Sequence, residues 1–222
     1  MISSNDRRRE PGGASPAAPV EVRLVAPPAA PRLDDLERLL SAEERRRAGR
    51  FHRREDRAVY VAVHGLLREV LGERLGRDPA SLRFEREAGG RPVLAGGGPA
   101  FSVSRARGAG LIALSGDGPV GADIERVSPR RYDAAVARRF FAPAERAILS
   151  GLNGDAWTAA FFRMWTRKEA ILKAQGKGIE AGLARIDTGD PPRVASPGGP
   201  YEPLAGWTLR SLELPAPWAG AV

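Results

Sequence analysis

The spacing of apolar residues changes from helical to alternating once in each half of this chain. Between Glu55 and Leu75, apolar residues recur every three or four positions, which indicates a long helix with one buried face. From Ser81 onward, short apolar runs alternate with a period of two, which is typical of strands. A second helical stretch over residues 156–175 is again followed by short runs. This order of helices and then antiparallel strands predicts an α+β fold.

Turn residues and shorter apolar runs place the remaining elements. Ser41 with Glu44 three residues later is the pattern of a capping box at a helix start. Asp117-Gly118 predicts a hairpin between strands expected at 111–115 and 120–125. Further helices are expected over residues 34–40, 41–51, 132–140 and 144–151. Further strands are expected over residues 20–25, 82–84, 101–104, 183–187 and 207–214.

The length of 222 residues, 42% of them hydrophobic, suits one large domain or two small ones. We expect a disordered tail over residues 1–19, because its arginines are not followed by the apolar segment of a secretory signal. We divide the rest into units over 20–119 and 120–222. The dipeptide Arg50-Phe51 before one long helix resembles Arg139-Phe140 before the other, which indicates a duplicated α+β unit.

The net charge of +8 predicts an anionic partner, such as nucleic acid, a phosphorylated small molecule or an acidic protein. Basic residues do not alternate with exposed aromatic residues, so single-stranded nucleic acid gains no support. Only three of the 35 basic residues are lysines, and they lie together at Lys168, Lys173 and Lys177. A lysine ammonium is a point charge suited to phosphate, although a solvated helix face also explains such a cluster.

Several kinds of site and location are excluded by what the sequence lacks. There is no cysteine, and therefore no disulfide or thiolate metal site. With His52 and His64 as the only histidines, a histidine-rich metal site is excluded, and the apolar neighbours of His64 predict a packed side chain. No Gly-x-Ser-x-Gly motif supports a nucleophilic serine. No run of about eighteen apolar residues occurs, so we expect no membrane-spanning segment and no membrane partner. From the absence of cysteine we expect a cytoplasmic protein.

The first group of candidate catalytic residues is Asp123 and Glu125 in an expected strand. Because side chains alternate along a strand, both carboxylates point to one face, roughly 7 Å apart. Two carboxylates at that distance repel each other unless a cation or a proton lies between them, and Mg²⁺ prefers such oxygen ligands. An ordinary exposed strand face, neutralised by Arg126, is the alternative.

The second group lies on the second long helix. Trp165, Glu169 and Lys173 are spaced four residues apart and form one stripe along it. A Trp packed beneath a carboxylate raises its basicity by desolvation, and Lys173 can reach a phosphate one turn further on. A stabilising surface pair between Glu169 and Lys173 explains the same spacing. Ser104 and Arg105, at the end of another expected strand, offer a hydroxyl and a guanidinium to an anion.

Taken together, three motifs resemble the 4'-phosphopantetheinyl transferase superfamily. They are Gly121-Ala122-Asp123-Ile124-Glu125, then Arg139-Phe140-Phe141 with Glu145, then the run from Trp165 through Lys168-Glu169-Ala170 and Lys173 to Gly176-Lys177-Gly178. Gly90-Arg91-Pro92 and the serines at 102 and 104 resemble its larger, two-subdomain kind, which primes carrier domains of non-ribosomal peptide and polyketide synthases. The resemblance covers about Leu33 to Asp187, and the chain ends at Trp218–Val222, where relatives commonly complete a last strand.

The resemblance implies two similar α+β subdomains related by a pseudo-two-fold axis, with coenzyme A bound in the cleft between them. It implies Mg²⁺, or Mn²⁺, held by Asp123, Glu125 and Glu169, with Glu169 also a candidate to accept the serine proton. Lys173 matches the lysine that contacts the pyrophosphate of coenzyme A, and Lys168 lies beside it.

Further residues match positions around the nucleotide. Arg47 matches a basic residue near the 3'-phosphate, Arg57 is a weaker match, and Arg91 matches a Lys or Arg near the nucleotide. Relatives usually have Ser-His where this chain has Ser104 and Arg105. Arg binds phosphate as a planar fork, so we expect binding to be retained with an altered pH dependence.

The implied function is Mg²⁺-dependent transfer of 4'-phosphopantetheine from coenzyme A to a serine of an acyl or peptidyl carrier protein, releasing adenosine 3',5'-bisphosphate. We expect a monomer that uses coenzyme A and a carrier protein as partners and does not bind nucleic acid. The residues alone leave two alternatives open. One is a metal-dependent phosphodiesterase or nuclease, and the other is a non-catalytic, basic nucleic-acid-binding protein.

Overall fold

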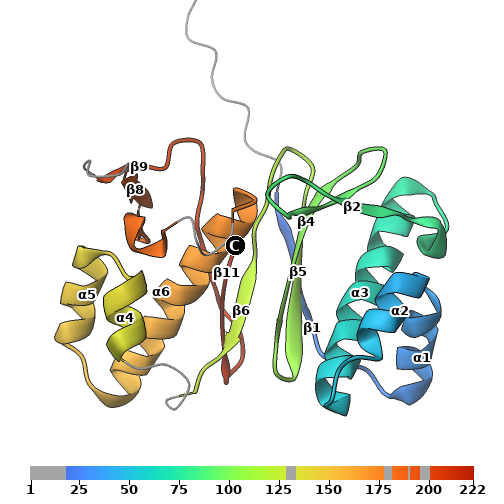
Figure 1. The fold of residues 1–222 in the computed structure, drawn as a ribbon, viewed down its shortest axis with the longest axis horizontal. Helices are drawn as coiled ribbons and strands as arrows, with labels where there is room; N and C mark the ends of the chain where they lie inside the picture. The colour runs from blue at the N-terminus through green and yellow to red at the C-terminus, as the bar shows by residue number, and fades with distance from the viewer. Residues whose placement is uncertain (1–18, 129–133, 178–181, 190, 196–200) are drawn as a thin grey trace, which may run out of the picture.

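The computed structural model describes residues 19–128, 134–177, 182–189, 191–195 and 201–222. The expected tail, apart from its last residue, and the expected helix start at Tyr132 lie outside these ranges (Figure 1). No helix in the described ranges is both long enough and apolar enough to cross a membrane.

Helices and strands occupy separate stretches of the chain, which confirms the predicted α+β class. The helices are α1 (Ala30–Arg38), α2 (Ala42–Ala48), α3 (Arg54–Leu75), α4 (Ala134–Phe140), α5 (Pro143–Ser150) and α6 (Gly154–Ala174), with short 3₁₀ helices η1 (Pro79–Ser81) and η3 (Leu183–Arg185). The strands are β1 (Glu21–Val25), β2 (Phe84–Arg86), β3 (Pro92–Leu94), β4 (Ala100–Ala106), β5 (Ala109–Ser115), β6 (Asp123–Arg126), β7 (Ile186–Asp187), β8 (Arg193–Ala195), β9 (Tyr201–Pro203), β10 (Ser211–Leu212) and β11 (Trp218–Ala221).

In the first half, α3 packs against an antiparallel sheet of order β1-β5-β4. The helical repeat predicted for this segment is present, because Val59, Val63, Leu67 and Leu71 are all buried in the core of this half. Each such side chain contributes roughly 1.5–3 kcal/mol when it is fully removed from water. Gly76 ends α3 in the left-handed conformation, at φ 60°, as glycine commonly does after a helix.

The second half repeats this order of elements around its own core. Its sheet has the order β10-β11-β6, again antiparallel, and α6 packs against β6 and β11. The core is rich in aromatic rings, with Phe161 stacked between Trp157 and Trp165. Figure 1 shows the two sheets in the middle of the molecule, with α1–α3 on one side and α4–α6 on the other.

The hairpin predicted at Asp117-Gly118 is wrong. The strand before it, β5, pairs with β1 and β4, and the strand after it, β6, pairs with β11 in the other sheet. The hairpin lies instead between β4 and β5, where Arg107-Gly108 forms the turn and Gly108 has φ 90°. Every residue of β5 is buried, so it is a central strand with both edges already paired.

The C-terminal strands also differ from the prediction. Of the strand expected over 207–214, only β10 forms, and the central strand β11 at Trp218–Ala221 was missed. That segment is short and small in its side chains, with Ala219, Gly220 and Ala221 following the tryptophan. Close packing favours these residues, because a Cβ on Gly220 would fall 2.8 Å from Leu214 and 3.1 Å from the Asp123 carbonyl oxygen.

The two sheets meet where β4 lies beside β6, without a backbone ladder between them. Side chains of β4 join them instead, because Ser102 Oγ accepts a hydrogen bond of 3.0 Å from the Ala122 backbone nitrogen. Gly121 just before β6 allows the chain to touch α6, since a Cβ there would fall 2.0 Å from the Ala170 carbonyl oxygen. This contact between halves places residues of β4, β6 and α6 within reach of one another.

Candidate active site

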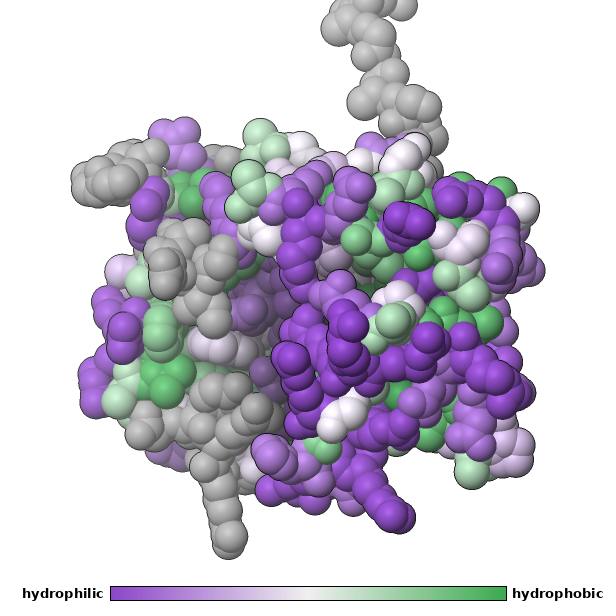
Figure 2. Space-filling view, turned by 45° about the vertical axis from the view of Figure 1, so that its right-hand side comes forward, coloured by the Kyte–Doolittle hydropathy of each residue, from purple (hydrophilic) through white to green (hydrophobic). Residues whose placement is uncertain are grey.

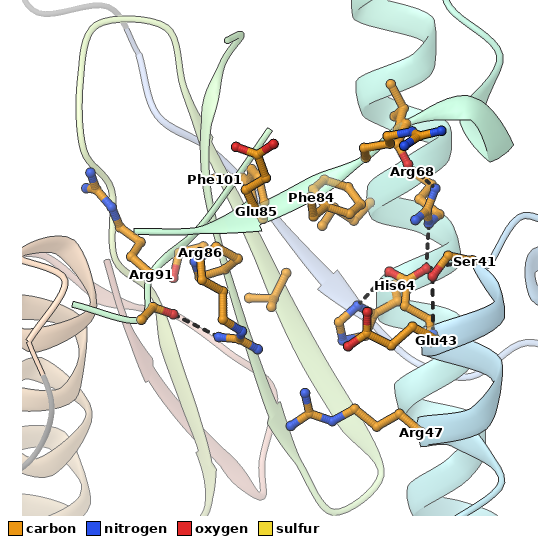
Figure 3. Close-up of a pocket in the computed structure, with 18 of the residues that line it drawn as sticks. Ser41, Glu43, Arg47, His64, Arg68, Phe84, Glu85, Arg86, Arg91 and Phe101 are labelled. Carbon is orange, nitrogen blue, oxygen red and sulfur yellow. Dashed lines mark hydrogen bonds and ion pairs between the residues drawn. The ribbon is translucent and has the colours of Figure 1, made fainter. Parts of the chain in front are cut away.

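A pocket of about 700 Å³ opens between α2, α3 and the strands β2–β4, and the C-terminal end of α6 closes one side of it. Figure 3 shows Arg47 from α2 and Arg86 from β2 extending toward the same space. Figure 2 shows strongly hydrophilic residues gathered over the half of the molecule that carries these elements. Residues from both halves of the sequence therefore line the pocket.

The pocket is strongly basic. Three carboxylates face eight cationic side chains among its lining residues, which suits an anionic ligand. The cationic residues are Arg47, Arg68, Arg83, Arg86, Arg91, Arg105, Lys173 and Lys177. The last two come from the end of α6 and the residues just after it, so an anion bound here would touch both halves.

A network of charged residues forms one wall of the pocket. The predicted capping box is present, with Glu44 accepting from the Ser41 backbone and Ser41 Oγ accepting from the Glu44 backbone. Glu44 also accepts from Arg68 Nε at 2.8 Å and lies 3.6 Å from His64 Nδ1. Burial acts to raise the pKa of Glu44, but hydrogen bonds from His64 and Ser41 and the Arg68 charge lower it to about 2. Glu44 is therefore ionised at neutral pH.

His64 is packed, as its apolar neighbours predicted. Its ring stacks on Tyr60 at 4.1 Å between centroids. Burial lowers the pKa of His64 and outweighs the attraction of Glu44, so the ring is neutral at physiological pH.

Arg105 lines the pocket. Its guanidinium lies over the rings of Tyr60 and Phe51, at 4.8 and 5.6 Å from their centroids. Burial lowers the pKa of Arg105, although an arginine remains charged at neutral pH. Stacking on ring faces leaves the N–H edge of a guanidinium available to a phosphate.

Asp123 and Glu169 form an acidic cluster behind the pocket. Asp123 Oδ1 accepts hydrogen bonds of 2.7 Å from Ser104 Oγ and from Lys173 Nζ. Asp123 Oδ2 and Glu169 Oε1 are buried and have no hydrogen-bond partner among the described residues. Neither acid lines the pocket itself, but Lys173 both lines the pocket and touches Asp123. The basic pocket and the acidic cluster therefore meet at this one lysine.

The pKa of Glu169 is raised to about 7. Burial is the largest cause, repulsion from Asp123 and Glu125 adds to it, and the Lys173 charge opposes it. Raised basicity through desolvation was predicted from Trp165, and burial is the largest cause. Trp165 itself packs in the aromatic core with Phe161. A carboxyl with this pKa can accept or donate a proton near neutral pH.

The acidic cluster fits a hard divalent cation. Two buried carboxylate oxygens without a hydrogen-bond partner are suitable ligands, and Mg²⁺ commonly takes one or two protein carboxylates together with substrate phosphate. In the part of the chain that the structure describes, no three His, Asp or Glu side chains are grouped closely enough to hold a metal. The expected third ligand, Glu125, acts on Glu169 through its charge but is not gathered with the other two acids into such a group.

The position predicted for Lys168 is wrong. It was expected beside Lys173 near the ligand, but its side chain is fully buried in the second half. Its ammonium pairs with Glu145 at 2.7 Å and donates to the carbonyl oxygens of Leu183 and Ile186. Five residues of α-helix turn a side chain by about 140°, so Lys168 and Lys173 point to different sides of α6.

Three other predicted residues have protein partners that change their expected roles. Arg57 pairs with Glu37 and does not line the pocket. Arg91 lines it, but also binds Glu87 and donates to the Ala174 carbonyl oxygen at the end of α6. Ser104 was expected to face an anion together with Arg105, but neighbouring residues of a strand point to opposite faces, and Ser104 donates to Asp123 instead.

Part of the pocket was not predicted from the sequence. Glu44 and Arg68 form its wall, and Arg83 and Arg86 line it beside them. The capping-box pattern identified Glu44 only as a helix start, while Arg68 lies within an apolar helical stretch, where a buried cation needs an acidic partner. That rule is a signal that could have linked the two residues.

Two family models match the chain. One is described as the 4'-phosphopantetheinyl transferase superfamily and matches residues 119–212. The other is described as 4'-phosphopantetheinyl transferase, N-terminal, and matches residues 27–106.

Curated relatives carry the same description. The chain is 36% identical over 165 residues to a putative 4'-phosphopantetheinyl transferase of Synechocystis, covering 73% of this chain and 67% of the relative. It is 38% identical over 151 residues to HetI of Nostoc, covering 66% and 64%, and 30% identical over 145 residues to Sfp of Bacillus subtilis, covering 65% and 63%. The chain thus spans about two thirds of the length of these relatives, and slightly less for HetI and Sfp.

Proposed function

This chain belongs to the 4'-phosphopantetheinyl transferase superfamily, in the larger kind that includes HetI and Sfp, and from that premise we propose that it transfers 4'-phosphopantetheine from coenzyme A to a serine of a carrier protein. The observation that carries the proposal is the position of Lys173. It lines the basic pocket and binds Asp123 of the acidic cluster, so one side chain joins an anion site to a cation site. A pyrophosphate held by a divalent cation requires both.

The proposed ligand of the pocket is the nucleotide part of coenzyme A. The volume of about 700 Å³ lies within the range of pockets for small molecules and cofactors. Arg105 and Arg47, which both line the pocket, are the proposed partners of the 3'-phosphate. The excess of cationic side chains supports this choice, because the ribose of coenzyme A carries a phosphate at its 3' position and a pyrophosphate at its 5' position.

Mg²⁺, or Mn²⁺ in its place, is the proposed metal, with Asp123 and Glu169 as its protein ligands and Glu125 contributing negative charge. When bound, it would neutralise charge on the pyrophosphate. The support from this chain is the pair of buried carboxylate oxygens that lack hydrogen-bond partners among the described residues.

The proposed reaction moves one phosphoryl linkage. The serine oxygen of the carrier protein forms a bond to the β-phosphorus of coenzyme A, and the bond from that phosphorus to the bridging oxygen breaks. Adenosine 3',5'-bisphosphate leaves with the bridging oxygen. Glu169 is the proposed acceptor of the serine proton, and Lys173 stabilises charge on the phosphates. Positioning and charge neutralisation are thus the main tasks of the protein.

We also propose that residues 20–119 and 120–222 are two similar units related by a pseudo-two-fold axis, with coenzyme A bound between them. In support, each half has a first strand at the sheet edge, two short helices, one long helix, a 3₁₀ helix and a returning central strand. Most residues that line the pocket belong to the first half, and its two lysines belong to the second.

Mass spectrometry tests the proposed function. The protein is incubated with coenzyme A, Mg²⁺ and apo carrier domains from fatty-acid and secondary metabolism, and we expect one carrier to gain the mass of phosphopantetheine. Glu169→Gln and Asp123→Asn should each lower the rate by at least about 100-fold while the far-ultraviolet circular dichroism is retained. No mass gain on any carrier would reject the proposal. Release of adenosine bisphosphate without a mass gain would indicate hydrolysis instead.

A further inference from the structure

Lys173 has its full set of hydrogen-bond partners inside the protein. Its ammonium donates to Ser104 Oγ at 2.8 Å, to the Ala122 carbonyl oxygen at 3.1 Å and to Asp123 Oδ1 at 2.7 Å. An ammonium has three N–H donors, so all of them are used. Lys173 also lines the pocket, and 31% of its side chain is exposed. It therefore cannot donate to a phosphate in the pocket without giving up one of these partners.

We propose that Lys173 pairs with Asp123 while the pocket is empty and moves to a phosphate when the ligand binds, so that phosphate binding removes the competing ammonium charge from Asp123 and favours the cation. The inference rests on the proposed function, because it takes coenzyme A and a divalent cation as the two ligands. It assigns Lys173 a second role, in which it links the binding of one ligand to the binding of the other.

Burial and hydrogen bonding favour this exchange over movement of Asp123. The Asp123 side chain is only 6% exposed, whereas that of Lys173 reaches the pocket. Ser104 Oγ continues to donate to Asp123 Oδ1 after the ammonium leaves, so the carboxylate keeps its orientation. A pyrophosphate offers the ammonium a charged acceptor in place of the one that it gives up.

The exchange has an electrostatic consequence for the cation. An ammonium 2.7 Å from a carboxylate oxygen repels a divalent cation that approaches the same carboxylate and offsets part of its negative charge. Cation affinity should therefore be low while the pocket is empty and rise when coenzyme A binds. By linkage, the cation must raise the affinity for coenzyme A by the same factor.

The test measures binding of the cation alone. Free Mn²⁺ is followed by electron paramagnetic resonance, and Mg²⁺ by calorimetry, with the full chain and no coenzyme A. We expect Lys173→Met to bind either ion about tenfold more tightly than the wild type, because the competing ammonium is gone. Lys173→Arg, which keeps the charge, should stay near the wild-type affinity. If Lys173 served only to bind phosphate, its substitution would not change the cation affinity measured without coenzyme A.

A matched control uses the other lysine of the pocket. Lys177→Met removes the same charge from the same lining, but Lys177 makes no ion pair with Asp123. Its cation affinity without coenzyme A should equal that of the wild type within about twofold. An equal gain in both variants would show a general effect of charge and would overturn the inference.

The second measurement repeats the titration with saturating coenzyme A and no carrier protein, so that no transfer occurs. We expect coenzyme A to tighten cation binding in the wild type, and this factor to be about tenfold smaller in Lys173→Met. Lys173→Gln replaces the Met variant if that does not fold. Unchanged cation affinity in a folded, neutral variant, or no cation binding in any variant, overturns the inference. If the wild type binds the cation but not coenzyme A, the proposed function fails, while the first measurement still shows whether Lys173 opposes cation binding at Asp123.

Discussion

The two halves of this molecule contain the same kind of buried ion pair in different surroundings. In the first half, Glu44 accepts from the backbone nitrogen of Ser41 and pairs with Arg68. Arg68 Nη1 donates further to the carbonyl oxygens of Pro79, the first residue of η1, and of Leu82, the residue after it. The pair therefore connects α2, α3 and the 3₁₀ helix that follows.

The second half repeats the arrangement with a lysine. Glu145 accepts from the backbone nitrogen of Ala142 and pairs with Lys168. Lys168 Nζ donates to the carbonyl oxygens of Leu183 and Ile186, which stand in the same relation to η3. Arg68 and Lys168 lie at equivalent positions in α3 and α6, counted from the first residue of each helix.

The difference between the pairs is their access to the pocket. Glu44, with 14% of its side chain exposed, and the buried Arg68 line it together with His64. Glu145 and Lys168 are 2% and 0% exposed and do not line it. The Glu44–Arg68 pair thus supports a pocket wall, whereas the Glu145–Lys168 pair stabilises only the core of its half. The comparison teaches that the neighbours of an ion pair, more than the pair itself, decide whether it serves a ligand.

The largest effect is expected when the enclosed pair is broken. Lys168→Met leaves the Glu145 carboxylate buried without its cation, and we expect a loss of about 3–5 kcal/mol in the free energy of unfolding. Urea denaturation followed by circular dichroism measures it. The double variant Glu145→Gln with Lys168→Met removes both charges and should lose less. A loss below about 1 kcal/mol in the single variant would show that the enclosed pair contributes no more than an exposed one.

The pair at the pocket wall should give a smaller effect that depends on pH. The pKa of Glu44 is about 2 in the folded protein against 4.5 for an ordinary Glu, so its stabilising contribution is present above pH 4.5 and lost as the pH falls toward 2. Glu44→Gln should cost up to about 3 kcal/mol at pH 7, and the difference from the wild type should shrink between pH 4.5 and 2.

Urea denaturation at a series of pH values measures the Glu44 effect. The matched control is Glu43→Gln, which removes the neighbouring carboxylate of the same helix turn but not the partner of Arg68. A difference between Glu44→Gln and the wild type that stays constant down to pH 2 would contradict the assignment.

The smallest effect is expected on ligand binding, when Arg105 in the pocket is changed. Arg105→His replaces a permanent charge at the pocket wall with one that is lost as the pH rises above about 6.5. We expect the variant to bind coenzyme A about tenfold more weakly at pH 8 than at pH 6, beyond any change seen in the wild type. Calorimetric titration at both pH values measures this. Arg107→His, two residues on and paired with Glu55 outside the pocket, should behave as the wild type.

Local patterns predicted the helices better than the strands. The long helices follow from a helical repeat that α3 satisfies with one buried face, and the capping box at Ser41 forms as expected. Strand pairing could not be predicted in the same way, because β5 is buried on both faces and shows no alternation that assigns its neighbours. Asp117-Gly118 has the composition of a hairpin turn, but β5 and β6 belong to different sheets.

The similarity of the two halves was predicted from two dipeptides that the comparison of the ion pairs does not align. The dipeptides Arg50-Phe51 and Arg139-Phe140 were matched, but alignment of Glu44 with Glu145 places Arg139-Phe140 opposite Arg38-Leu39. The sequence alone did not show how to align the two halves, because the cation of the ion pair is an arginine in one half and a lysine in the other.

For the candidate site, the sequence identified which residue types matter and was less able to assign their partners. Asp123 and Glu169 lie together and Lys173 joins them to the pocket, whereas Lys168, one residue from Glu169, points into the core. Burial and orientation around a helix axis separate the two lysines, and composition carries no information on either.

The contact between β4 and β6 has a consequence for aggregation. Each of these strands pairs with a neighbour on one side only, and its other edge faces the opposite half without a ladder. Exposed strand edges are templates for pairing with other chains. Because Ser102 and Ser104 of β4 bond to Ala122 and Asp123 beside them, each half covers the edge that the other would otherwise present to solvent. The contact between the two halves therefore protects these two edges, those of β4 and β6, from pairing with another chain.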